Sequence, residues 1–307
     1  MRAHDKLYIG GEWVEPATSK VIEVISPHSE ELVGRVPEGS EADIDRAVAA
    51  AREAFDKGPW PRMTPAERLE ILQRFAGIYA SRLDEMAEVI TTEMGSPISF
   101  SKVGQSPPPL LILNAMLAVG AAYEWEDTRT GVFGGNVIVR REPVGVVGAI
   151  APWNVPQFTA MSKLAPALVA GCTIVLKPSP ETPLDTMLMA EMLTEAGVPT
   201  GVVSIIPAGR EVGEHLVRHP GVDKIAFTGS TAVGRHIASI CGEQLKRVSL
   251  ELGGKSAAIV LDDADLGVLA TGLQLASFMN NGQACVAQTR ILASRERYDE
   301  TVDAIAS

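Results

Sequence analysis

Between Val144 and Leu252, short apolar segments alternate with longer amphipathic ones, and this alternation constrains the fold more than any other feature. The apolar segments read as buried strands and the segments between them as helices. The predicted strands are 144–150, 172–177, 202–206, 222–227 and 247–252, and the predicted helices are 156–169, 183–196, 211–218 and 231–241. Because strands that alternate with helices form a parallel sheet covered on both faces, we predict a doubly wound α/β domain.

Before this region the sequence predicts a small hairpin and several helices. Residues 8–14 surround Gly10-Gly11 and predict the hairpin. Ser40 and Asp43 form a capping-box pattern ahead of a helix, and Thr64 is the expected N-cap of the first of two helices, over 65–80 and 82–94. Pro107-Pro108-Pro109 predict a break ahead of an apolar helix over 110–123, and residues 131–141 predict extended structure with glycine-rich turns.

Charge and cysteine content exclude several classes of protein. The 307 residues carry a formal net charge of −11, which disfavours nucleic acid and anionic membranes as partners. Three widely spaced cysteines without a CxxC pair disfavour a disulfide framework and a cysteine zinc site, so no metal site is expected. The N-terminus lacks the apolar segment of a secretory signal, and the apolar run 110–123 is too short to cross a bilayer. We therefore expect a cytoplasmic protein.

Doubly wound sheets bind ligands beyond the carboxyl ends of their strands, so the residues that follow each strand are the candidates for function. Pro152-Trp153-Asn154 follow the first strand and read either as a turn with a packed Trp or as a stacking surface with an amide donor for a developing negative charge. Lys177 ends the second strand, either as a surface lysine or as a donor to ligand hydroxyls or phosphate.

Glycines mark the helix starts after the third and fourth strands. Gly209 and Gly213 follow the third strand, and Gly229-Ser230 with Gly234 follow the fourth. Free N–H groups at a helix start favour an anion, although tight turns are the alternative. Neither segment matches G-x-G-x-x-G, and the sequence before Lys255 lacks the first glycine of a P-loop because Ser249 stands there.

Two reactive side chains complete the candidate set. Glu251 stands among apolar residues and ahead of two glycines, a setting that raises a carboxyl pKa as a general base requires; a carboxylate bonded to backbone amides is the alternative. Cys285 follows a segment of polar residues and glycine whose amides favour a thiolate or an oxyanion. Cys172 and Cys241 are expected to be inert core residues.

Four motifs together resemble the NAD(P)-dependent aldehyde dehydrogenase superfamily, in order from about Tyr8 to the end of the chain. They are Leu250-Glu-Leu-Gly-Gly-Lys-Ser256, Phe278-Met-Asn-Asn-Gly-Gln-Ala-Cys285, Pro152-Trp-Asn154 and Phe227-Thr-Gly-Ser-Thr231. The resemblance implies that Cys285 is the nucleophile, Glu251 the general base and Asn154 the side-chain amide of the oxyanion hole. It implies a cofactor site made of Ile150, Pro152, Trp153, Lys177, Gly209, Gly213, Gly229, Ser230, Val233, Gly234 and Leu252.

The implied reaction is NAD(P)-dependent oxidation of an aldehyde to a carboxylic acid through a thiohemiacetal and a thioester on the cysteine. A CoA-acylating semialdehyde dehydrogenase is one alternative, which Glu251 argues against because that branch needs no hydrolytic base. A catalytically inactive remnant that binds dinucleotide is the other. Val155, Thr159 and Ser162 resemble positions in the aldehyde tunnel and are small or polar, which indicates room for the substrate without identifying it.

Two departures from the family pattern affect the expectations. The family's ribose-binding Glu falls on Pro180, with Glu181 one residue later, and no basic residue stands close by in the sequence; NAD is therefore favoured, with NADP possible. The sequence ends soon after Cys285, whereas family members continue. The resemblance therefore implies an NAD(P)-binding domain over 1–122 and 144–252, a bridging or oligomerisation hairpin over 123–143, and the start of an incomplete α/β catalytic domain over 253–307. Relatives form oligomers, and a homo-oligomer is expected to be weakened without the C-terminal pairing strand.

Overall fold

The central sheet has the doubly wound order that the alternation of strands and helices predicts. The computed structural model describes residues 2–306. Five parallel strands lie side by side in the order β12 (Arg247–Leu252), β11 (Lys224–Gly229), β8 (Val146–Ile150), β9 (Thr173–Lys177) and β10 (Val203–Ile205). Along the chain, β8 is followed by β9 and β10 on one side of it, and then β11 and β12 are added on its other side. The winding direction therefore changes between β8 and β11. Ligands bind doubly wound sheets at such a point.

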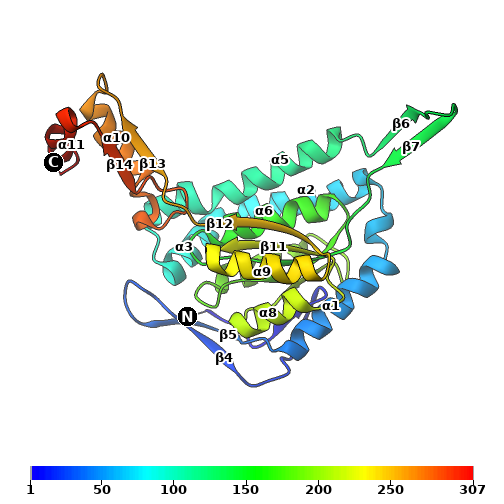
Figure 1. Ribbon diagram of the computed structural model, residues 1–307. Helices are drawn as coiled ribbons and strands as arrows, with labels where there is room; N and C mark the ends of the chain where they lie inside the picture. The colour runs from blue at the N-terminus through cyan, green and yellow to red at the C-terminus, as the bar shows by residue number, and fades with distance from the viewer. Residues whose placement is uncertain (1, 307) are drawn as a thin grey trace.

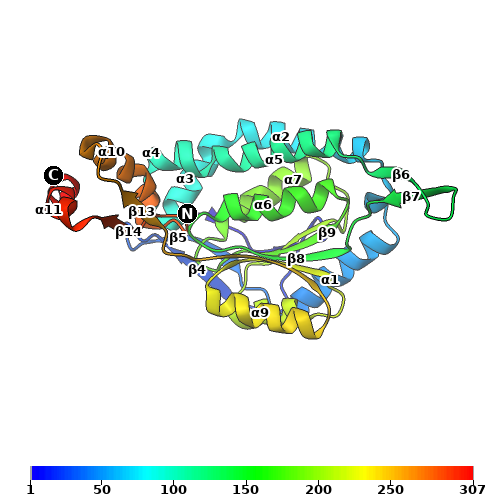
Figure 2. The ribbon, with the colours of Figure 1, turned by 45° about the horizontal axis from the view of Figure 1, so that its top comes forward.

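Helices cover both faces of this sheet. The connecting helices are α6 (Pro156–Val169), α7 (Leu184–Glu195), α8 (Arg210–Arg218) and α9 (Thr231–Glu243). Figure 2 shows α6 and α7 on one face and α9 with α1 (Glu41–Asp56) on the other. The β9 side chains alternate accordingly, since Ile174 and Leu176 pack into the core under α6, whereas Val175 packs into the core with α1.

The predicted hairpin around Gly10-Gly11 is present and also extends the sheet. Strands β2 (Leu7–Ile9) and β3 (Glu12–Val14) pair antiparallel, and both glycines have positive φ angles of 60° and 85°. Strand β2 pairs antiparallel with β10, so the sheet has seven strands. A second sheet contains β1 (Arg2–Ala3), β5 (Leu32–Pro37) and β4 (Val21–Ile25).

The N-terminal helices begin where their capping residues predict. The main-chain N–H of Ser40 donates to the Asp43 carboxylate over 2.8 Å at the start of α1. The main-chain N–H of Thr64 likewise donates to Glu67 over 2.7 Å at the start of α2 (Pro65–Ser81). Each side chain thus satisfies a main-chain group that the helix leaves free. Helix α3 (Leu83–Met94) follows and ends at Gly95 with φ of 80°.

The predicted chain break at Pro107–Pro109 is wrong, because the three prolines begin helix α5 (Pro107–Ala122). The first N–H groups of a helix have no intrahelical acceptor, so proline loses no hydrogen bond there. The preceding turns are α4 (Ile98–Phe100) and a π-helical segment, η2 (Ser101–Gln105). The chain therefore runs on in helical form through the region where the sequence predicts an interruption.

Two projections extend from opposite ends of the molecule (Figure 1). One is the antiparallel hairpin of β6 (Glu126–Thr130) and β7 (Asn136–Arg140), which confirms extended structure in this region. The other contains the parallel pair β13 (Ala257–Val260) and β14 (Arg290–Ala293). Its helices are α10 (Leu266–Ala276) and α11 (Tyr298–Ala306).

Short 3₁₀ turns are η1 (Trp60–Arg62), η3 (Met279–Gly282) and η4 (Arg295–Arg297). Within residues 2–306, no helix is long and apolar enough to cross a membrane.

Candidate active site

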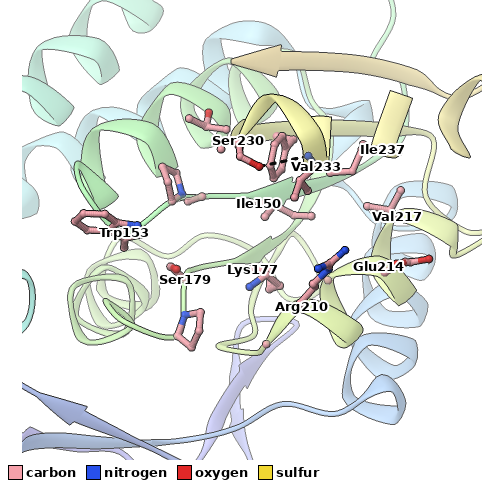
Figure 3. A pocket seen from close by; sticks show the side chains of 18 of the residues that line it. Ile150, Trp153, Lys177, Ser179, Arg210, Glu214, Val217, Ser230, Val233 and Ile237 are labelled. Carbon is pink, nitrogen blue, oxygen red and sulfur yellow. Dashed lines mark hydrogen bonds between the residues drawn. The ribbon is translucent and has the colours of Figure 1, made fainter. Parts of the chain in front are cut away.

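A cavity of about 380 Å³ lies at the carboxyl ends of β8, β9 and β11, next to helices α8 and α9 (Figure 3). It stands where the winding direction of the sheet changes, as expected for a doubly wound fold. Most residues that the sequence predicts for cofactor binding line it. They are Ile150, Pro152, Trp153, Lys177, Gly209, Gly213, Gly229, Ser230 and Val233. Gly234 and Leu252 are not among the lining residues, and they pack against each other: a Cβ on Gly234 would come within 2.5 Å of Leu252 Cδ2.

Lys177, the last residue of β9, is buried rather than extended into solvent. Its Nζ donates hydrogen bonds to the main-chain oxygens of Pro178, over 3.0 Å, and Ala208, over 2.5 Å. Burial lowers the pKa of Lys177 to about 8, and the carboxylate of Glu181 opposes this shift. A Cβ on Gly213 would lie only 3.2 Å from Lys177 Cε, so the missing side chain leaves space beside the lysine. Two of the three ammonium hydrogens are thus used within the protein, and the third is available to an oxygen of a ligand in the cavity.

The start of α9 faces the same cavity. The hydroxyl of Ser230 accepts a 3.3 Å hydrogen bond from the main-chain N–H of Val233 and so caps the helix. The remaining N–H groups of the first turn and the helix dipole favour a negative group, as the sequence predicts.

One lining residue, Arg210, is not among the site residues that the sequence predicts. Arg210 reaches the cavity from the first position of α8, so a basic residue is present although none stands close to Pro180 in sequence. The Glu181 carboxylate, which accepts a hydrogen bond from the Ser179 hydroxyl, also lines the cavity. The position of Arg210 just after Gly209 was the available signal, because it marks the start of a helix at a strand end.

A second cavity, of about 660 Å³, adjoins the first, and both are lined by Phe227 and Thr228 at the end of β11. Cys285 and Glu251 both line this second cavity. The predicted tunnel residues Val155, Thr159 and Ser162 line it as well. The structure therefore brings together the two candidate reactive groups, which lie on separate segments of the sequence.

The surroundings of Glu251 differ from the prediction. The residue lies within β12, opposite Thr228, and its side chain is exposed rather than enclosed by apolar neighbours. The edge position of β12 explains this, since one side of the strand has no neighbour among the described strands.

Lys163 is a residue of the second cavity that sequence reasoning missed. Its buried Nζ donates to the Thr228 hydroxyl over 2.5 Å and to the Thr159 carbonyl over 3.3 Å. Burial lowers the pKa of Lys163 to about 8, whereas the nearby charge of Glu251 raises it. A single charged residue, a lysine, inside a largely buried helix was the available signal, because such a residue is costly to bury without partners.

Asn154 connects the first strand end to the segment that carries Cys285. Its Nδ2 donates a 2.7 Å hydrogen bond to the main-chain oxygen of Gln283. The main-chain oxygen of Asn154 accepts hydrogen bonds from Asn280 Nδ2 over 2.9 Å and from Gln105 Nε2 over 3.0 Å. The predicted oxyanion-hole residue thus lies beside the predicted nucleophile segment.

The segment before Cys285 forms a tight turn. Asn280, Asn281 and Gly282 all have positive φ angles, of 54°, 56° and 74°. The Asn281 side chain donates a 3.0 Å hydrogen bond to the main-chain oxygen of Gly95. The thiol of Cys285 is exposed. This turn is a strained, hydrogen-bonded conformation of the kind found at functional sites.

Cys172 and Cys241 are buried, which confirms their predicted place in the core. Burial raises the pKa of both thiols, so they stay protonated and unreactive at neutral pH. Within the described part of the chain, no group of three or more His, Cys, Asp or Glu side chains is arranged to hold a metal ion.

Comparison with known proteins identifies the family of this chain. The model of the aldehyde dehydrogenase family matches residues 13–307. The chain belongs to the aldehyde dehydrogenase family. Geranial dehydrogenase from Castellaniella defragrans is 46% identical over 303 residues, which cover 99% of this chain and 63% of that protein.

Solved aldehyde dehydrogenases share the fold. The structure of a Mycobacterium tuberculosis aldehyde dehydrogenase complexed with NAD⁺ matches with a TM-score of 0.96 and 48% identity, over 99% of this chain and 63% of that one. A cysteine-to-alanine mutant of aldehyde dehydrogenase C from Pseudomonas syringae, complexed with NAD⁺ and octanal, matches with a TM-score of 0.94 and 38% identity, over 98% and 61%. The chain therefore spans 61–63% of the length of these relatives, and the predicted α/β aldehyde dehydrogenase fold is confirmed.

The residues of the first cavity fit a nicotinamide dinucleotide. Lys177 supplies a buried amine for hydroxyl or phosphate oxygens, and the start of α9 supplies N–H groups for a phosphate. Gly213 leaves the space that a side chain would fill beside Lys177. The cavity also adjoins the cavity of Cys285, as a coenzyme that reacts there requires.

Proposed function

We propose that this chain is the coenzyme-binding and nucleophile-bearing part of an enzyme that oxidises an aldehyde to a carboxylic acid with NAD. One observation carries the proposal: Cys285 and Glu251 line a single cavity, which adjoins a dinucleotide-type cavity at Phe227 and Thr228. The NAD⁺ complexes of two aldehyde dehydrogenases of similar fold support the coenzyme.

In the proposed site, Lys177 and the start of α9 hold the coenzyme, and Ile150, Trp153 and Val233 line its cavity. The nicotinamide, when bound, supplies a hydride acceptor. The Glu181 carboxylate in this cavity favours a free ribose hydroxyl over a 2′-phosphate, because a phosphate would bring two negative groups together. We therefore propose NAD as the coenzyme. Because the basic side chain of Arg210 also lines this cavity, an assay should compare NAD with NADP.

Cys285 is the proposed nucleophile. Its thiolate adds to the aldehyde carbon and forms the new C–S bond, while the carbonyl oxygen takes the negative charge. Asn154 Nδ2 has one hydrogen engaged with Gln283, so its other hydrogen is available to this oxygen. The main-chain N–H of Cys285 supplies the proposed second donor. Loss of hydride from the same carbon leaves a thioester on Cys285.

Glu251 is the proposed general base for release of the acid. Its exposed carboxylate at the cavity wall takes a proton from water, and the resulting hydroxide adds to the thioester carbon. The C–S bond then breaks, the carboxylic acid leaves and the Cys285 thiolate is restored. The buried amine of Lys163 lies near Glu251, and the charge of this carboxylate raises the pKa of the lysine against the effect of burial.

The substrate end of the second cavity is lined by Val155, Thr159 and Ser162, whose small side chains leave room for an acyl chain. The names of related proteins include geranial and phenylacetaldehyde dehydrogenases, and one solved relative holds octanal. We propose an aldehyde with an apolar chain of this size range as the substrate.

The domain division and the assembly are also proposals. We assign residues 1–122 and 144–252 to coenzyme binding, 123–143 to an oligomerisation arm and 253–307 to the beginning of a catalytic domain. The β6–β7 hairpin supports the second assignment, because Val132 and Phe133 at its tip are almost fully exposed. We propose the cytoplasm as the location, because a reducing compartment keeps the exposed Cys285 thiol free.

The direct test is reduction of NAD⁺ and NADP⁺, measured separately, by the purified protein with octanal, geranial and phenylacetaldehyde. The Cys285→Ser variant is the control for the thiol, and Cys241→Ser is a matched cysteine control. We expect coenzyme reduction and acid formation without CoA, both abolished by Cys285→Ser alone. Product formation only in the presence of CoA would indicate an acylating enzyme, and dinucleotide binding without turnover would contradict the proposal.

A further inference from the structure

A buried glutamine joins the two halves of the candidate active site. Gln105 is the last residue of the π-helical segment η2 and is fully buried. Short π-helical segments are rare and occur frequently at functional sites. The sequence itself gives no signal for Gln105, which lies far from the motifs of the site.

The amide of Gln105 makes two contacts with the site. Its Nε2 donates a 3.0 Å hydrogen bond to the main-chain oxygen of Asn154 and another of 3.0 Å to Asn280 Oδ1. Asn280 Nδ2 in turn donates to the same Asn154 oxygen over 2.9 Å. The three residues therefore form a closed triangle of hydrogen bonds, which fixes the amide orientations because a main-chain oxygen only accepts.

This triangle sets the position of Asn154 relative to the cysteine segment. The Asn154 main chain is held by Gln105 and Asn280, while its side chain donates to Gln283 over 2.7 Å. Asn280 belongs to the left-handed turn that leads to Cys285. Loss of the Gln105 donor would leave Asn280 Oδ1 buried and without this partner, which costs more than a solvent-exposed hydrogen bond.

We propose that Gln105 is a positioning residue that sets the geometry between the Asn154 amide and the Cys285 thiol. This inference rests on the proposed function, because its consequence for catalysis requires that these two groups act on the aldehyde. Gln105 itself touches no reacting atom. A misplacement of reacting groups by about 1 Å lowers rates by up to about 100-fold, so the effect on turnover is expected to be large.

Gln157 provides a matched control within the same fold. It is also a fully buried glutamine, in the first turn of α6, close in sequence to Asn154. Its side-chain amide lies near the buried carboxyl of Asp185 and, within residues 2–306, makes no hydrogen bond with Asn154 or Asn280. Gln157→Met and Gln105→Met make the same change of volume and polarity, and only Gln105→Met removes contacts with Asn154 and Asn280.

The experiment compares the parent, Gln105→Met and Gln157→Met by kcat, KM for the aldehyde, Kd for NAD⁺, and hydrogen exchange of the amides of residues 279–285. We expect Gln105→Met to lower kcat by about 10- to 100-fold with a Kd for NAD⁺ within about twofold of the parent. We also expect faster exchange in the cysteine segment, whereas Gln157→Met keeps the parent kcat and exchange.

Two results would overturn the inference. One is an unchanged exchange rate in residues 279–285 of Gln105→Met. The other is a loss of kcat and NAD⁺ affinity in equal proportion, which would show a general structural role. If the parent itself does not turn over, the proposed function fails, and exchange of the cysteine segment alone decides the inference: faster exchange in Gln105→Met than in Gln157→Met supports it, and equal exchange overturns it.

Discussion

The side-chain amide of Asn154 donates a 2.7 Å hydrogen bond to the main-chain oxygen of Gln283, shortly before Cys285. This contact joins the segment after β8 to the turn that carries the thiol. It uses one of the two amide hydrogens of Asn154 and leaves the other for an oxyanion. The same residue therefore contacts the segment before Cys285 and, in the proposed mechanism, supplies a donor to the oxyanion.

Removal of this amide should affect turnover more than coenzyme binding. We expect Asn154→Ala to lower kcat by about 10²- to 10³-fold, the range for loss of one oxyanion-hole donor. The Kd for NAD⁺ should stay close to the parent value, because Asn154 does not line the coenzyme cavity. Asn114→Ala, at an exposed position in α5, is the matched control for steady-state kinetics and NAD⁺ titration. A parent-like kcat in Asn154→Ala would contradict the assignment.

The buried amine of Lys177 should make coenzyme binding depend on pH. Burial lowers its pKa to about 8, so the free protein loses the charge as pH rises through about 8. The charged form donates more strongly to hydroxyl and phosphate oxygens, and the affinity for NAD⁺ should therefore fall between pH 7 and pH 9. We expect Lys177→Met to weaken binding by about 10- to 100-fold at pH 7, the range for a charged hydrogen bond, and to abolish the dependence on pH.

Calorimetric titration of NAD⁺ at pH 7 and pH 9 measures both effects. Lys57→Met, at an exposed lysine after α1, is the control for loss of a positive charge. Equal pH dependence in Lys177→Met and in the parent would show that another group controls the binding.

The buried carboxyl of Asp185 should make folding stability fall as pH rises. Asp185 is fully buried, and burial raises the pKa of its carboxyl to about 7 from 3.8, although the nearby Gln157 amide and the main-chain N–H of Thr186 oppose this shift. Between these values the folded protein holds a proton that the unfolded chain releases. The contribution of Asp185 to the free energy of unfolding is therefore largest below about pH 4 and declines as the pH rises to about 7.

Asp185→Asn should remove this decline. The slope for one proton is at most about 1.4 kcal/mol per pH unit, so urea unfolding at pH 5 and pH 7 gives a measurable difference. Glu93 accepts hydrogen bonds from the main-chain N–H groups of Leu184 and Asp185, and burial raises its pKa also, so part of the pH dependence persists. Asp262→Asn, at an exposed residue, is the control. The same loss of stability in parent and Asp185→Asn would rule out Asp185 as the source.

The sequence predicts the elements whose signals are local. Strands and helices between Val144 and Leu252 lie where the apolar pattern places them, and α1 and α2 begin at their capping residues. The antiparallel pairing of β2 with β10 was not predicted, because strand partners distant in sequence leave no local pattern. The break predicted at the proline run is wrong because prolines also occupy the first positions of helices.

The same difference between local signals and long-range contacts applies to the candidate site. Most cofactor-site residues predicted from motifs at strand ends line one cavity, since the carboxyl ends of parallel strands meet there. Arg210 and Lys163 have only weak local signals, a helix start at a strand end and a lysine inside a buried helix, and Gln105 enters the site through tertiary packing alone. The exposure of Glu251 follows from the place of β12 at the edge of the sheet, which the pattern of a single strand does not reveal.

The central claim is that Cys285 carries the acyl group and Glu251 releases it. Intact-protein and peptide mass spectrometry of Glu251→Gln, mixed with NAD⁺ and octanal, tests it most directly. The account predicts an adduct with the mass of the octanoyl group, confined to Cys285 and absent when NAD⁺ is omitted. No adduct in a variant that still binds NAD⁺, or an adduct on Cys172 or Cys241, would contradict the account.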